Sequence, residues 1–276
     1  MSGWLKHIAE RGHPVDSPAT SFGGHRPAYM VLDQRRASGR CADLIGQPGW
    51  RDFLTLFATT PLAPLIDASP WLIELDVGSV AWHSGETLCR EQHLGWIFQP
   101  AQATSLNDLA DHLRRLFVLD DPHGGQSLVN LQAPTAWTAL LAASSDTAYA
   151  QLIGPLGRVV TPTPLSHWQV WQPVDDADNV EIPPLTQTLE IALKESPRGW
   201  WLSQATDTPL QALPAEWLER LGQLEAAGIH QAHHLQRLLP KVCEDDADWW
   251  AQASTMQLLQ AARPAWQKVD ALEASA

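Results

Sequence analysis

The stretch LGWIFQPAQATSLNDLADHLRRL, residues 94–116, changes from the hydrophobic pattern of a strand to that of a helix. It begins with a short apolar run closed by Pro100, which is typical of a buried strand. Ser105 then stands three residues before Asp108, as at the capped start of a helix. One apolar face follows at helical spacing, formed by Leu106, Leu109, Leu113 and Leu116. A strand followed by a helix predicts an α/β fold here.

The same alternation of strand and helix patterns extends over roughly residues 28–172. Further strands are predicted at residues 28–33, 71–75 and 128–131, and helices at 50–57 and 135–143. Because alternating strands and helices are typical of parallel sheets, we expect an α/β lobe with a mainly parallel or mixed sheet.

The remaining sequence differs in composition from this lobe. Pro, Gly, Ser and His dominate the first residues, and acidic, proline-bounded sequence follows the lobe. Beyond it, apolar residues recur at helical spacing, with Pro214 near a helix start and Gly228 as its stop. We predict four parts: an irregular leader (1–25), the α/β lobe (26–172), a linker (173–184) and a smaller, mainly helical lobe (185–276).

Charge and cysteine content limit the classes of partner. The 276 residues carry 31 acidic and 18 basic side chains, a net charge of −13. Nucleic acids and anionic membranes attract clustered Lys and Arg, so both are poor partners, whereas a protein with a basic face fits better. No apolar run approaches the ~20 residues that cross a bilayer. Three scattered cysteines suit a reducing cytoplasm, where we expect this chain.

Tryptophan is unusually abundant, with 14 residues. Most are predicted to lie in the core. The adjacent pairs are harder to bury because neighbouring side chains diverge by about 100° on a helix. At least one ring of each pair should face another lobe or a partner. The predicted partner-binding residues are those beyond the linker: Trp200, Trp201, Trp217, Trp249 and Trp250.

Motifs for chemistry are weak. No phosphate-binding loop or dinucleotide fingerprint occurs, and His83-Ser84-Gly85 is predicted to be a tight turn between strands. His230, His233 and His234 have partial metal-ligand spacing, but no third ligand is indicated and a polar helix face is favoured. We therefore predict no catalytic, cofactor-binding or metal-binding residues, and a binding protein rather than an enzyme.

The order of several short motifs resembles the type VI secretion effector-adaptor, or effector-chaperone, family catalogued as domain of unknown function 4123. Four motifs of that family each have a counterpart in this sequence. They are a strand ending in an acid, an Ala-Pro-aromatic element, a helix of Leu-x-x-His-Leu-Arg-Arg-Leu type and a Gly-Pro near the domain end. The matching positions are Tyr29, Asp33, Pro70, His112, Leu113, Arg114, Arg115, Gly154 and Pro155.

The resemblance covers roughly residues 26–172 and has one departure. The family often carries Arg-Phe-Tyr-Asp-Pro-Arg after the helix, whereas residues 130–135 here keep only the proline and an apolar position. The helical part beyond the linker matches no family pattern, as fits adaptors whose second lobe varies with the cargo.

The resemblance implies a cytoplasmic adaptor of a Gram-negative bacterium. It would bind one secreted toxic effector and help to load it onto the VgrG spike, without a cofactor. Two alternatives stay open. One is an immunity-type protein that neutralises a toxin, and the other is an enzyme with a dispersed site that uses His112, Asp33 or the His230 group.

Overall fold

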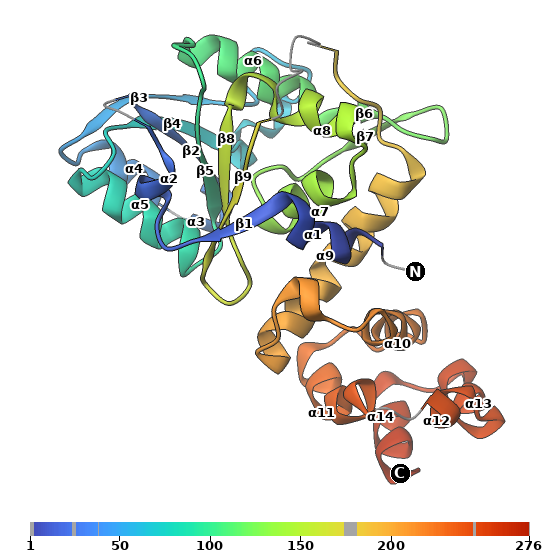
Figure 1. The fold of residues 1–276 in the computed structure, drawn as a ribbon. Coiled ribbons are helices and arrows are strands. Elements are labelled where there is room, and N and C mark those ends of the chain that lie inside the picture. The colour runs from blue at the N-terminus through green and yellow to red at the C-terminus, as the bar shows by residue number, and fades with distance from the viewer. Residues whose placement is uncertain (1–2, 24–25, 38, 174–180, 245–246, 276) are drawn as a thin grey trace.

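The computed structural model describes residues 3–23, 26–37, 39–173, 181–244 and 247–275 (Figure 1). Its centre is a seven-stranded sheet in the order β1-β9-β8-β5-β2-β4-β3. The strands are β1 (Gly12–Val15), β2 (Ala28–Leu32), β3 (Trp50–Thr55), β4 (Trp71–Leu75), β5 (Gly95–Gln99), β8 (Arg158–Pro162) and β9 (Trp168–Trp171). A separate hairpin consists of β6 (Val118–Asp120) and β7 (Gln126–Leu128).

All neighbouring strands of the large sheet are antiparallel, so the predicted mainly parallel or mixed sheet is wrong in its strand direction. The unit β4, α5 (Val80–Arg90) and β5 explains the error. β4 and β5 run in the same direction, but β2 lies between them and pairs antiparallel with both. A strand–helix–strand pattern in sequence does not reveal that a third strand separates the pair.

Helices cover both faces of the sheet, in three layers (Figure 1). Met30 and Leu32 of β2 face one core, whereas Tyr29 and Val31 face the other. The first face carries α2 (Pro18–Ser21), α3 (Gln34–Ala37), α4 (Arg40–Ile45) and α5. The second carries α1 (Trp4–Arg11), α6 (Leu106–Leu116), α7 (Pro134–Ala143), α8 (Asp146–Ile153) and α9 (Gln187–Thr206). Burial on both faces explains why β2 is apolar without alternation.

The predicted irregular leader is wrong for the described residues. It contains α1, β1 and α2. Trp4, Leu5 and Ile8 of α1 are buried, and β1 forms the sheet edge by pairing with β9. These contacts come from residues far along the chain, so the local Pro- and Gly-rich composition gave no sign of them.

The predicted helix at residues 50–57 is also wrong, because Trp50–Thr55 is the edge strand β3. The register shifts between Trp50 and Asp52, where β3 has one residue more than β4. This bulge brings Trp50 and Phe53 to the same face, against the core that contains Ile73. Apolar residues three positions apart then imitate the spacing of a helix.

Other predicted elements are confirmed in part or in full. α6 and α7 agree with the predicted helices, whereas of the strand predicted at 128–131 only Leu128 lies in a strand. Short 3-10 turns complete the lobe: η1 (Ala63–Ala68) and η2 (Gly154–Leu156). Within the described part of the chain, no helix combines the length and apolar character needed to cross a membrane.

The C-terminal region is helical, as predicted. It extends away from the sheet (Figure 1) and contains η3 (Leu210–Ala212), α10 (Ala215–Ala226), α11 (Ala232–Cys243), α12 (Ala247–Ala251), α13 (Ala253–Gln260) and α14 (Ala265–Ala274). α9 packs on α7 and also on α10, so it joins both regions. Most of the predicted linker, residues 174–180, lies outside the described residues.

Candidate partner-binding surface

Trp249 and Trp250 lie in the core of the C-terminal helices, with 5% and 7% of their surfaces exposed. Their rings contact each other edge to face with centroids 5.0 Å apart. Each indole N–H donates to a backbone carbonyl, Trp249 to Ser275 at 3.2 Å and Trp250 to Lys241 at 3.1 Å. Both rings are therefore buried in the folded chain, between the ends of α11 and α14, and the role of this pair in partner binding stays a prediction.

The other predicted tryptophans are also packed. Trp200 is buried, and its ring meets His93 of the α/β lobe edge to face at 5.3 Å. Trp201 and Trp217 are partly buried against the same core. We predicted that one ring of each pair faces another lobe or a partner. The ring of Trp200 faces another lobe. In this conformation the five rings do not form one exposed patch.

His112 joins two of the family-motif segments. Its Nε2 lies 3.0 Å from the Leu152 carbonyl, 40 positions along the chain. Its Nδ1 is buried and has no hydrogen-bond partner among the residues that the structure describes. The ring packs on Gly154, where an added Cβ would lie 3.0 Å from the imidazole Cε1. Gly154 also has a φ of +38°, which favours glycine. The motif histidine and the motif glycine thus hold α6 against the end of α8.

Stability should depend on pH through His112. Burial lowers the pKa of His112 from 6.5 to about 4, so the folded chain holds this ring neutral while the unfolded chain protonates it near pH 6.5. The resulting stabilisation is complete above pH 6.5 and is lost as pH falls toward 4. We expect His112 to account for about 2 kcal/mol of lost unfolding free energy between pH 7.5 and 5.

His112→Gln tests this expectation by guanidinium denaturation at both pH values. Glutamine keeps an amide donor for the Leu152 carbonyl but does not titrate. The variant should therefore lose less stability on acidification than the wild type. His83→Gln is the control, because His83 is exposed. Equal pH dependence in His112→Gln and wild type would contradict the assignment.

Other family-motif side chains also have roles in the fold. Asp33 is buried and its Oδ1 accepts from the Arg36 backbone N–H at 3.1 Å, at the start of α3. Tyr29 stacks on Phe98 with centroids 5.3 Å apart, and burial raises its pKa to about 12. The Pro70 carbonyl accepts from the Leu56 backbone N–H at 3.0 Å, which ties β4 to the end of β3.

The motif arginines lie at the C-terminal end of α6. Arg114 pairs with Asp111 at 2.8 Å and donates from Nε to the Leu56 carbonyl at 3.1 Å, whereas Arg115 contacts the Asp111 carbonyl at 3.4 Å. At the other end of α6, Ser105 accepts from the Asp108 backbone N–H at 3.1 Å and donates to its carboxylate at 2.6 Å, as the capped start predicts. Leu113 is fully buried in the core.

A broad hollow adjoins these arginines, and we call it the α6 groove. Its volume is about 780 Å³. Its walls combine the loop at residues 59–62, the end of α6, the β6–β7 hairpin and residues 181–184. Arg114, Arg115, Asp120 and Glu181 supply charges of both signs, beside apolar Leu62, Val118 and Ile182. The volume lies within the range of small-ligand pockets, but a lining that mixes charges of both signs with apolar residues is typical of a surface that contacts a polypeptide.

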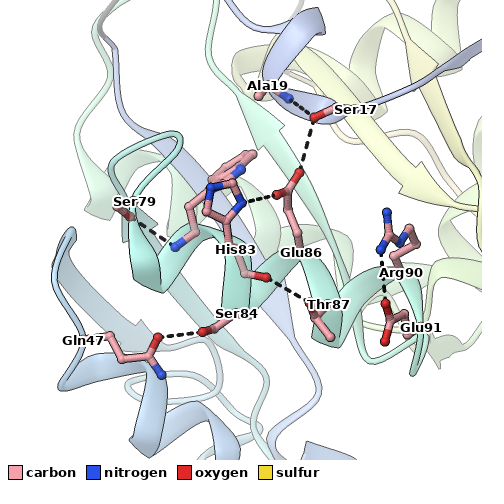
Figure 2. Close-up of polar contacts among 11 residues, drawn as sticks. Ser17, Ala19, Gln47, Ser79, His83, Ser84, Glu86, Thr87, Arg90 and Glu91 are labelled. Atoms are coloured by element: carbon pink, nitrogen blue, oxygen red, sulfur yellow. Dashed lines mark hydrogen bonds and ion pairs between the residues drawn. The ribbon is translucent and has the colours of Figure 1, made fainter.

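His83 and Ser84 lie in α5, so the predicted tight turn at His83-Ser84-Gly85 is wrong (Figure 2). Glu86 lies between two groups: its Oε2 is 3.1 Å from His83 Nδ1, and its Oε1 accepts from Ser17 Oγ at 3.5 Å. A catalytic triad needs the histidine between the hydroxyl and the acid, which this order does not provide. Ser84 instead donates to Gln47 at 2.7 Å.

The C-terminal histidines do not assemble a metal site. His233 and His234 place their rings 4.0 Å apart. Among the residues that the structure describes, no three or more His, Cys, Asp or Glu side chains are grouped so that they could hold a metal ion.

Two buried cations of the C-terminal region were not predicted. Arg220 donates to the Val242 and Glu244 carbonyls, at 2.8 and 2.5 Å, where α11 ends. Lys268 donates to the Ala227 and Leu259 carbonyls, at 2.8 and 2.7 Å, where α10 and α13 end. Both cations stabilise the negative ends of helix dipoles. The only sequence signal is that each falls among apolar residues on a helix face.

These features define a mixed α/β domain with an antiparallel sheet covered on both faces and a helical C-terminal region. Residues 28–151 match the model of a family described as Domain of unknown function (DUF4123). The match supports the resemblance to this domain of unknown function over residues 28–151, and its description assigns no function, so the adaptor role stays a prediction. No curated protein and no solved structure matches the chain.

Proposed function

We propose that this protein is a non-enzymatic cytoplasmic adaptor that binds a type VI secretion effector and helps to load it onto the VgrG spike. The match of residues 28–151 carries the proposal, together with the order of the motifs within that range. The motif side chains support a binding role because they serve the fold: His112 holds α6 to α8, and Asp33 caps α3. Neither of these two side chains lines the α6 groove, which Arg114 and Arg115 border.

An adaptor that joins two proteins needs two separate surfaces. Most of the α6 groove lies within the range that matches the family, whereas its wall at residues 181–184 and the C-terminal helices lie outside the match. We assign the common partner, the spike, to the α6 groove. The effector is assigned to the C-terminal helices, since a surface specific for one cargo belongs where the family pattern ends.

Coexpression with the products of neighbouring genes tests the proposal. We expect one of them to copurify with this chain in a fixed ratio, and its secretion to stop when the adaptor gene is deleted. The absence of a complex with every neighbouring product would contradict the proposal. An immunity-type protein differs in outcome, because it would protect cells from the toxin and would not be needed for its export.

A further inference from the structure

A hollow of about 330 Å³ lies where α10, α13 and α14 meet, and we call it the Lys268 pocket. Its lining is Gln223, Ala226, Ala227, Met256, Leu259, Gln260 and Lys268. Most of this wall is apolar, and the two glutamines add neutral amides. Among the residues that the structure describes, Lys268 is the only charged side chain that lines it.

Within the described part of the chain, the charge of Lys268 has no carboxylate partner. The side chain is 6% exposed, and its ammonium donates to two helix-end carbonyls. An ammonium has three N–H donors, so one remains for another acceptor. Among the described residues no carboxylate forms an ion pair with it; Glu225 pairs with Arg198, and Asp270 with Arg237. Partial charges of helix ends offset a full buried charge incompletely.

The surface around the pocket resembles the centre of a protein interface. Residues 251–262 include no charged side chain. Met256 is 38% exposed, although it is apolar. Interface centres are depleted in charge and enriched in methionine relative to other surfaces. An open hollow would bury too little of a small acid for tight binding, whereas a polypeptide also gains contacts beyond the rim.

We propose that the Lys268 pocket binds an acidic side chain of a partner polypeptide. The carboxylate would accept the remaining N–H of Lys268, and apolar carbon beside it would pack on Met256 and Leu259. The net charge of −13 does not oppose this contact strongly, because salt screens charges beyond about 8 Å. That the partner is the secreted effector rests on the proposed function; the chemistry of the pocket does not.

The site can be tested on the full chain with ¹³C-methyl methionine labelling. Met256 lies in the pocket wall, while Met30 is buried in the other core and serves as an internal reference. The probes are acetyl-Leu-Glu-Leu-amide and its neutral analogue acetyl-Leu-Gln-Leu-amide. We expect the Glu peptide to shift the Met256 resonance in a saturable way, with affinity about tenfold above the Gln peptide. Equal affinities, or no shift up to about 10 mM, would overturn the proposal.

Two variants separate binding from folding. Lys268→Met should remove the preference for the Glu peptide, but it also removes two helix caps and can unfold the region. Gln260→Glu keeps Lys268 and places a competing carboxylate in the pocket wall, so it should weaken Glu-peptide binding about tenfold. Gln257→Glu is the matched control, because it adds the same charge on α13 outside the pocket lining. Equal peptide affinity in both glutamate variants would contradict the site.

Failure of this site and failure of the adaptor function give different results. If the Glu peptide binds but no neighbouring gene product copurifies, the proposed binding by the Lys268 pocket is supported and the proposed adaptor function is wrong. If the effector copurifies equally with wild type and Gln260→Glu, and the peptide does not bind, the adaptor function stands and the pocket is wrong.

Discussion

Replacing Trp249 and Trp250 together with alanine is expected to unfold the C-terminal helices. Each ring is almost fully buried and packs on the other, and cations lie over both, Lys241 at 5.4 Å from Trp249 and Arg220 at 5.9 Å from Trp250. Truncation of a buried tryptophan costs about 3–5 kcal/mol of unfolding free energy. The loss of both rings therefore removes more unfolding free energy than a small helical region has.

Hydrogen exchange followed by mass spectrometry would measure this effect. We expect lost protection in α11, α12 and α14, with the sheet still protected. Trp266→Ala is the matched control, because that ring is 54% exposed and its loss should change stability by less than about 0.5 kcal/mol. If the double variant keeps its protection but no longer binds the partner, the expectation is contradicted. The two rings would then contact the partner directly.

The second large effect is expected for Gly95→Ala in the centre of the sheet. Gly95 of β5 pairs with Leu32 of β2, and an added Cβ would lie 2.0 Å from the Val31 carbonyl oxygen. That oxygen belongs to the backbone of the neighbouring strand and cannot move without disturbing the pairing. We expect a loss of about 3 kcal/mol or more, and a lower yield of folded protein.

Guanidinium denaturation followed by circular dichroism at 222 nm checks this expectation. Gly46→Ala is the control, because its nearest neighbour would be the Asp43 carbonyl oxygen at 3.9 Å. It should remain within about 0.5 kcal/mol of wild type. An unchanged midpoint for Gly95→Ala would show that β2 and β5 are not in the register described.

Local signals predicted the elements that are stabilised locally. α6 was predicted correctly because Ser105 caps it and its leucines recur at helical spacing. β3 was missed because a bulge changes which residues share a face. Strand direction was missed because β2 separates β4 from β5, a long-range arrangement that alternation of elements does not encode.

The candidate surfaces were less predictable than the fold. The rings of Trp249 and Trp250 diverge from one helix, but both are buried by packing in three dimensions, against the ends of α11 and α14, which the sequence pattern does not reveal. The Lys268 pocket depends on three helix segments that meet in space, so no short motif could indicate it. Family resemblance identified His112 and Gly154 as motif positions, while the structure adds that they touch each other.

The edge strand β1 has a consequence for synthesis on the ribosome. The Ile8 carbonyl accepts from Gln169, 161 positions later, and β1 is completed only by β9. At roughly 5–20 residues per second, the ribosome needs about 8–30 s to produce that partner. During most of this time the apolar side chains of Trp4, Leu5 and Ile8 also lack α7, the helix on which α1 packs. The nascent chain therefore passes through an aggregation-prone interval before its first helix can dock.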